Sequence, residues 1–191
     1  MSTLRPGHRA ALLIVDVQVG VMARAWNAAE VVGNIDLAVG RARQQRVPVI
    51  WVQHESEDLR RDSGAWQLVP ELGPWSGERH IAKRFPSSFE ATGLENCLAE
   101  IGISRIVLAG AQTNWCIRAT AYAALERGYD LTLLADAHTT ESIELDDGSR
   151  IEAAGVVADL NLAMKWLRYP GRSNAIAKAR EFDFSVVAGQ S

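Results

Sequence analysis

Short apolar runs alternate with amphipathic segments along most of the chain, and this alternation restricts the possible fold more than any other feature. The apolar runs predict buried strands at 11–16, 47–53, 105–110 and 131–136. Helical periodicity predicts helices between and after them, at 27–46, 92–102, 115–127 and 149–167. Strands that alternate with helices form a mostly parallel sheet with helices on both faces. We therefore expect one α/β domain over residues 1–191.

The expected ends of these elements rest on local signals. A Ser, Thr or Asn followed three residues later by Glu marks a helix N-terminus. Three helices carry this capping-box pattern, in the pairs Asn27–Glu30, Thr92–Glu95 and Ser149–Glu152. Residues 55–80 are polar and rich in Gly, Pro and Trp, which predicts a long functional loop. A last strand is expected near Val186 and Val187.

Charge and composition exclude several classes of partner. The 191 residues carry a formal net charge of -3 with both signs spread along the chain, so neither nucleic acid nor an anionic membrane is expected as a partner. No apolar run approaches the roughly 20 residues that span a bilayer, and no secretory signal is recognisable. Two cysteines cannot form a disulfide framework, which favours reduced thiols and a cytoplasmic location.

Two reactive side chains fall where parallel strands end. Asp16 closes an apolar strand, and Cys116 follows the strand at 105–110, so both are expected at the carboxyl edge of the sheet, where ligands bind. A helix N-terminus favours thiolate, so Cys116 is predicted to have a pKa below the ~8.5 of a free thiol if a lysine is near, although Asp16 opposes this. The alternatives are a packed small cysteine and an aspartate that caps a helix or braces a loop.

Lys83 is one of only three lysines among the 20 basic residues, and this rarity makes it a candidate for a functional role. A solvated loop charge is the usual alternative for a lysine at such a position. His54 ends the second predicted strand and is interpreted as a loop or pocket histidine, because no second histidine follows at metal-ligand spacing. His138 is interpreted as a turn residue. Side chains that are candidates for a substrate pocket are Gln18, Trp26, His54, Trp66 and Trp115.

Three separated motifs occur in a characteristic order. They are Asp16-Val-Gln, Lys83-Arg-Phe-Pro-Ser-Ser-Phe89 and Gly110-Ala-Gln-Thr-Asn-Trp-Cys116. In this order they resemble the isochorismatase-like cysteine hydrolases, and the likeness runs from about residue 9 to residue 140.

The resemblance implies a fold and a set of site residues. The fold is a three-layer αβα, Rossmann-like arrangement around a six-stranded, mostly parallel sheet. The implied catalytic triad is Cys116, Asp16 and Lys83. A cis peptide between Ala111 and Gln112 is implied, with an oxyanion hole made by the backbone N–H groups of Gln112 and Cys116. Self-association into a dimer or larger homo-oligomer is also implied.

The predicted activity is hydrolysis of a small-molecule carboxamide through a thioester on Cys116. The stretch Val52-Gln-His54 departs from the metal-binding Asp-x-His of nicotinamidases, so neither a metal nor another cofactor is expected. One alternative is an isochorismatase-type vinyl-ether hydrolase, which often lacks the cysteine. Another is a non-catalytic or redox thiol protein, although Cys97 lies on a predicted core face and could not act as a resolving partner.

Overall fold

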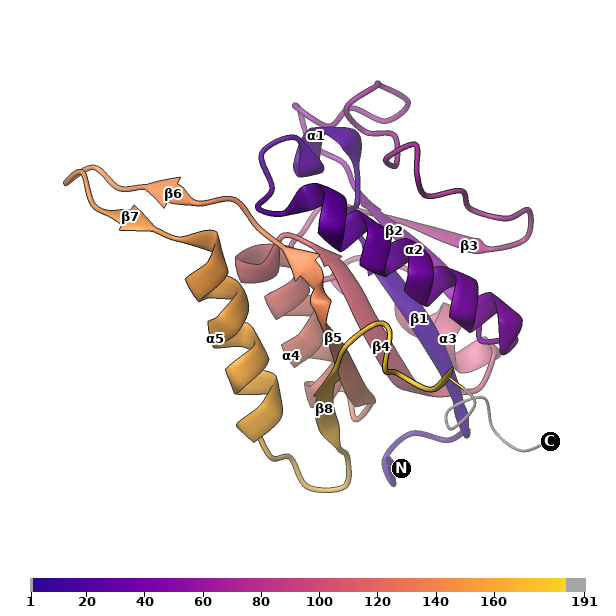
Figure 1. Cartoon of the computed structure of the whole chain (residues 1–191). Helices are drawn as coiled ribbons and strands as arrows, with labels where there is room; N and C mark the ends of the chain where they lie inside the picture. Colours follow the sequence, from indigo (N-terminus) through magenta and orange to yellow (C-terminus); the bar gives the residue numbers. More distant parts are fainter. Residues whose placement is uncertain (1, 185–191) are drawn as a thin grey trace.

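The fold is organised around one six-stranded sheet, seen here in a computed structural model that describes residues 2–184 (Figure 1). All five pairings between neighbouring strands are parallel. The strand order across the sheet is β3 (Arg79–Lys83), β2 (Val49–His54), β1 (Arg9–Val15), β4 (Ile103–Ala111), β5 (Asp130–Thr139) and β8 (Asn174–Ala177). The predicted α/β fold with a six-stranded sheet is therefore confirmed.

Helices cover both faces of this sheet and form the outer two layers. One face is covered by α2 (Ala28–Gln44), which lies in front of the sheet in Figure 1. The other face is covered by α3 (Leu94–Glu100), α4 (Arg118–Glu126) and α5 (Ala153–Trp166). A short helix, α1 (Val19–Met22), lies between β1 and α2.

Side-chain alternation along β1 connects the two cores. Leu12 and Ile14 pack with the apolar face of α2, whereas Leu13 and Val15 pack on the other face with α3, α4 and α5. Successive side chains of a strand point to opposite faces, so a strand between two helical layers must be apolar throughout. This explains why β1 is a continuous apolar run in the sequence.

Four strands of the main sheet were predicted, and two were missed. The missed strands are the edge strands β3 and β8, in which most side chains are exposed or half-buried. An edge strand needs no apolar run, so its sequence lacks the signal of a buried strand. The hairpin of β6 (Ile143–Glu144) and β7 (Arg150–Ile151), which projects away from the sheet in Figure 1, was also missed. The strand expected at Val186 and Val187 lies outside the described residues.

The helix start predicted at Asn27 is confirmed, but none of the three predicted capping boxes is formed. Asn27 does precede α2, but it has a left-handed backbone with φ of 49° and makes no side-chain cap. Glu95 forms an ion pair with Arg5 in place of a capping contact. Ser149 lies in the hairpin turn, where its hydroxyl donates to Asp147, so α5 starts only at Ala153. Glu95 thus takes part in a tertiary contact and Ser149 in a local turn, and neither caps a helix.

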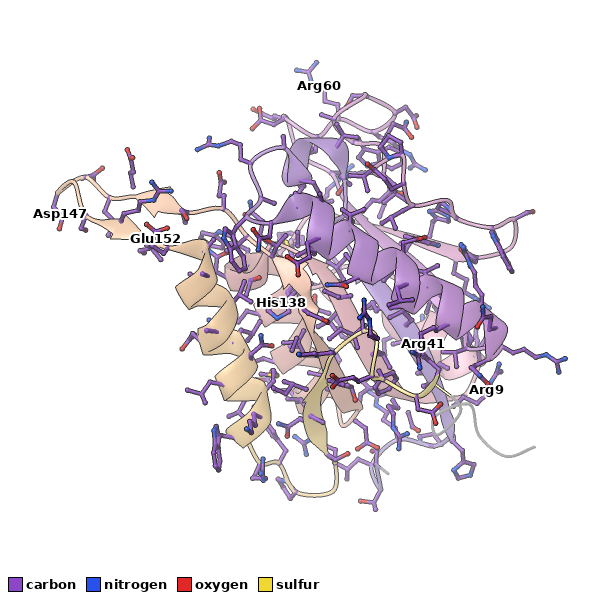
Figure 2. The ribbon with its side chains drawn as sticks, in the orientation of Figure 1. Arg9, Arg41, Arg60, His138, Asp147 and Glu152 are labelled. Carbon is purple, nitrogen blue, oxygen red and sulfur yellow. The ribbon has the colours of Figure 1, made fainter. Side chains whose placement is uncertain are left out.

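Two labelled residues in Figure 2 show the contrast between interior and surface. His138 lies inside the fold near the sheet, whereas Asp147 lies at the tip of the hairpin. His138 is part of β5 and almost fully buried, so its interpretation as a turn residue is wrong.

Among the described residues, the helices include none with both the length and the apolar character needed to cross a membrane.

Gly110 allows the close approach of β4 and β1, and its replacement gives a test of the fold. It pairs with Val15 and has φ of 128°, and a Cβ atom there would lie 2.0 Å from the Val15 carbonyl oxygen. We predict that Gly110→Ala lowers the free energy of unfolding by about 3 kcal/mol or more, as measured by urea denaturation. Gly33→Ala, in open space on α2, should instead stabilise by about 0.5–1 kcal/mol. Equal effects of the two changes would contradict this account.

Candidate active site

Three separate elements bring Asp16, Lys83 and Cys116 to the carboxyl edge of the sheet. Asp16 directly follows β1, Lys83 is the last residue of β3, and Cys116 lies in a turn that follows β4. The backbone of Asp16 has φ of 54°, a left-handed conformation that aspartate adopts more readily than most residues. The side chains of Asp16 and Lys83 are almost completely buried.

The ammonium group of Lys83 lies at the centre of this group. Its Nζ is 2.6 Å from Asp16 Oδ2 and 3.2 Å from Cys116 Sγ. A third contact, also of 3.2 Å, joins Nζ to Nδ1 of His54. Lys83 therefore links the carboxylate, the thiol and the imidazole, and it is not a solvated loop charge.

Gln18 holds the backbone of His54 in place. Its side-chain amide donates to the carbonyl oxygen of His54 at 3.0 Å and accepts from the N–H of His54 at 2.8 Å. The same amide donates to the carbonyl of Trp66, from the loop that follows β2. Gln18 is fully buried and connects β1, β2 and this loop. Its side chain does not line the cavity beside Cys116, so the predicted role in a substrate pocket has no support.

The turn that carries Cys116 is π-helical and spans Thr113–Ile117, with α4 starting only at Arg118. The single helix predicted at 115–127 is therefore two elements. Buried His138 fixes this turn, because Nδ1 accepts from the Thr113 hydroxyl at 2.9 Å while Nε2 donates to Asn161 of α5 at 3.1 Å. Burial lowers the pKa of His138 to about 4, so it stays neutral as this hydrogen-bonding pattern requires.

The pKa of the Cys116 thiol differs from the expectation. Burial raises the pKa of Cys116 to about 12, and the Asp16 charge adds to this, while Lys83 acts in the opposite direction. The expected low pKa of this thiol is thus wrong, because desolvation exceeds the effect of one lysine. Burial also raises the pKa of Asp16, against the attraction of Lys83. A proton on the thiol and a basic carboxylate beside it form an acid–base pair.

The peptide bond between Ala111 and Gln112 is cis. The carbonyl oxygen of Gln112 accepts from the N–H groups of Trp115 and Ile117, each at 3.1 Å, and so closes the turn. Gln112 and Cys116 both line the cavity described next. Their backbone N–H groups remain the predicted oxyanion hole.

A cavity of about 490 Å³ opens beside the thiol. Of the predicted pocket residues, His54 and Trp115 line it, together with Asp16 and Cys116. Trp26 and Trp66 do not line it. Trp26 is exposed, and its backbone N–H donates to the carbonyl oxygen of Thr140. Trp66 lines a separate pocket formed with the loop after β2.

Sequence reasoning missed the polar wall of this cavity. Arg24 and Glu141 form an ion pair of 3.0 Å at its edge, and the Gln112 side chain donates to Glu141 at 3.4 Å. Ser56 and Asp58, from the loop after β2, also line it. These residues lie in connections without a periodic pattern, so only the folded chain brings them together.

A metal ion fits this donor set poorly. In the part of the chain that the structure describes, Asp16, His54 and Cys116 offer ligand atoms within 4.8 Å of one another. Lys83 Nζ contacts all three side chains, so a positive charge is already present where a cation would bind. A divalent ion there would have to displace the ammonium or bear its repulsion.

Comparisons with known proteins identify the family of this chain. The family described as "Isochorismatase domain" matches residues 10–160. The isochorismatase family protein YddQ of Bacillus subtilis is 29% identical over 147 residues, covering 72% of this chain and 81% of that protein. A streptothricin hydrolase of Streptomyces noursei is 31% identical over 146 residues, and the match covers 72% of this chain but only 57% of that relative.

Solved structures extend the match to the whole fold. An isochorismatase from Pseudomonas putida KT2440 has a TM-score of 0.80 at 27% identity, covering 91% of this chain and 89% of that one. The family match spans most of the chain and includes Asp16, Lys83 and Cys116. The chain therefore belongs to the isochorismatase family of hydrolases.

The buried ion pair gives a test of the site's energetics. We predict that Lys83→Met lowers the free energy of unfolding by roughly 3–5 kcal/mol, because it leaves the Asp16 carboxylate buried without its partner. The double variant Asp16→Asn/Lys83→Met should recover part of this loss. Lys165→Met, on an exposed position of α5, should change stability by less than about 0.5 kcal/mol in the same urea titrations. A double variant less stable than Lys83→Met would contradict the pairing.

Metal dependence provides a second test. We predict that dialysis against EDTA leaves turnover unchanged and that elemental analysis finds well under one equivalent of zinc per chain. The reason is the ammonium of Lys83 at the centre of the donor set. Stoichiometric metal, lost together with activity on chelation, would contradict this.

Proposed function

We propose that this protein hydrolyses a small-molecule carboxamide through a thioester on Cys116. The observation that carries the proposal is the contact of one buried lysine with both a carboxylate and a thiol at the wall of a cavity of about 490 Å³. A thiol beside a base is the arrangement of covalent acyl transfer. The cavity is the size of a small-molecule site.

Asp16 is the proposed general base and acid. It takes the thiol proton as Cys116 Sγ attacks the amide carbonyl, and the backbone N–H groups of Gln112 and Cys116 bind the oxyanion. Asp16 then gives the proton to the departing amine as the C–N bond breaks, which leaves an acyl thioester. Water attacks the thioester, Asp16 accepts a proton from the water and returns it to the sulfur, and the carboxylic acid leaves.

The charge balance of the site supports this sequence. The raised pKa of Asp16 makes it a stronger base than a solvated carboxylate, and the raised pKa of Cys116 keeps the proton on sulfur until the substrate is present. The ammonium of Lys83 lies next to both groups, so it stabilises whichever of them carries the negative charge. A proton can then move between Cys116 and Asp16 without uptake of an ion from solvent.

An acyl substrate fits the site better than a vinyl ether. Cys116 can form a thioester only with a carbonyl carbon, and a vinyl ether offers none. The relative from Streptomyces noursei is named as a streptothricin hydrolase and not as an isochorismatase. The alternative of a redox thiol has little support, because Cys97 lies on the buried face of α3, in the core.

A screen of amides with acid quenching tests the proposal. For a substrate that is turned over, mass spectrometry of the quenched protein should show the acyl group on Cys116 and not on Cys97. Cys116→Ser should lower kcat/KM by at least about 10³-fold, since the nucleophile is far less ionised. Full activity of this variant, or cleavage of a vinyl ether without acylation, would refute the amidase mechanism.

The charge on Asp16 predicts opposite effects on two reactions of the same thiol. Asp16→Asn removes a charge that raises the pKa of Cys116, so iodoacetamide should alkylate Cys116 several times faster at pH 8 than in the wild type. Amide turnover should fall by about 10²-fold or more, because the base is lost. Asp36→Asn, at an exposed position of α2, should change neither rate. Slower alkylation in Asp16→Asn would show that Asp16 does not raise this pKa.

A further inference from the structure

His54 is the third residue held by Lys83, and the proposed mechanism does not use it. Its ring lies at the end of β2, half-buried, and it lines the cavity next to Asp16 and Cys116. The bond from Lys83 to Nδ1 measures 3.2 Å. This contact determines which nitrogen of the ring carries the proton.

A lysine ammonium has three N–H groups and no lone pair, so it only donates hydrogen bonds. The three polar contacts of Lys83 Nζ are Asp16 Oδ2, Cys116 Sγ and His54 Nδ1. His54 Nδ1 must therefore accept, which places the single proton of the neutral ring on Nε2. Burial and the neighbouring Lys83 charge both lower the pKa of His54, which agrees with a neutral ring.

The position of Lys83 also orients the ring. Lys83 is fully buried behind the cavity wall and does not line the cavity, whereas His54 does. The ring edge with Nδ1 thus faces the protein interior, and Nε2 lies on the far side of the ring. Nε2 has no hydrogen-bond partner among residues 2–184, so its N–H is available to a ligand. Gln18 holds the backbone of His54 by two hydrogen bonds, so this donor is pre-positioned.

We propose that His54 is a substrate-binding residue whose Nε2–H selects amides that carry a hydrogen-bond acceptor beside the scissile carbonyl. This rests on the proposed function, since the acceptor is defined relative to the carbonyl that Cys116 attacks. The preferred substrates are carboxamides with a ring nitrogen, carbonyl or ether oxygen close to the amide. Simple aromatic or aliphatic amides bind less well, because they leave the N–H without a partner.

The tautomer is tested first, by ¹⁵N NMR of the four histidines at pH 7, with His54→Gln used to assign the His54 signals. The expected result is a protonated Nε2 and an unprotonated Nδ1. A protonated Nδ1 would overturn the inference, because Lys83 could not then donate to it.

Binding is tested with aldehydes that add reversibly to a nucleophilic thiol. Benzaldehyde is compared with the three pyridine carboxaldehydes, which have almost the same shape and place an acceptor at each ring position in turn. Each is titrated for protection of Cys116 against iodoacetamide in the wild type, His54→Phe and His54→Gln. Ratios between variants cancel the different intrinsic reactivities of the aldehydes.

In the wild type, at least one pyridine isomer should protect Cys116 at a lower concentration than benzaldehyde does. In His54→Phe, the ratio of these two concentrations should fall about fivefold to tenfold, as loss of one hydrogen bond predicts. His54→Gln should retain a larger share, because its amide can accept from Lys83 and still donate to the ligand. Equal ratios in wild type and His54→Phe for all three isomers would overturn the inference and leave the proposed function intact. Failure of all four aldehydes to protect Cys116 would instead refute its nucleophilic role, and the inference with it.

Discussion

One ammonium group, that of Lys83, connects Asp16, His54 and Cys116 in the candidate site. It forms an ion pair with a carboxylate after β1 and hydrogen bonds with an imidazole at the end of β2 and a thiol after β4. These elements are neighbours in the sheet or directly adjacent to it, so the parallel arrangement is what allows one lysine to reach all three. The cost of burying this charge is offset by the Asp16 carboxylate and by the two hydrogen bonds.

This central cation explains several properties of the site together. It opposes the effect of burial on the pKa of Asp16 and of Cys116, and it contributes to the lowered pKa of His54. It also occupies the position that a metal would take among the same donors. A lysine thus supplies the positive charge that a divalent ion would otherwise provide, and it does so as part of the fold.

The surroundings hold this arrangement rigid through buried polar contacts. Gln18 ties β1 to β2 and to the loop that follows, and His138 ties the Cys116 turn to α5. Both side chains have hydrogen-bond partners on more than one element, which limits the movement of the groups they hold. The cavity wall is less constrained, since it includes exposed residues such as Arg24 and Asp58 from connecting segments. Differences in substrate among related proteins are expected to arise from this wall.

The sequence by itself determined the alternation of strands and helices and the placement of Asp16 and Cys116 at strand ends, because buried parallel strands must be continuous apolar runs. The likeness of its motifs to a known family added Lys83. Only the tertiary structure decided the rest. The edge strands β3 and β8 have no apolar pattern, the polar wall comes from distant connections, and the pKa of Cys116 depends on burial that no local pattern reports. The contact between Lys83 and His54 joins residues 29 positions apart, and spacing alone could not predict which ring nitrogen would accept.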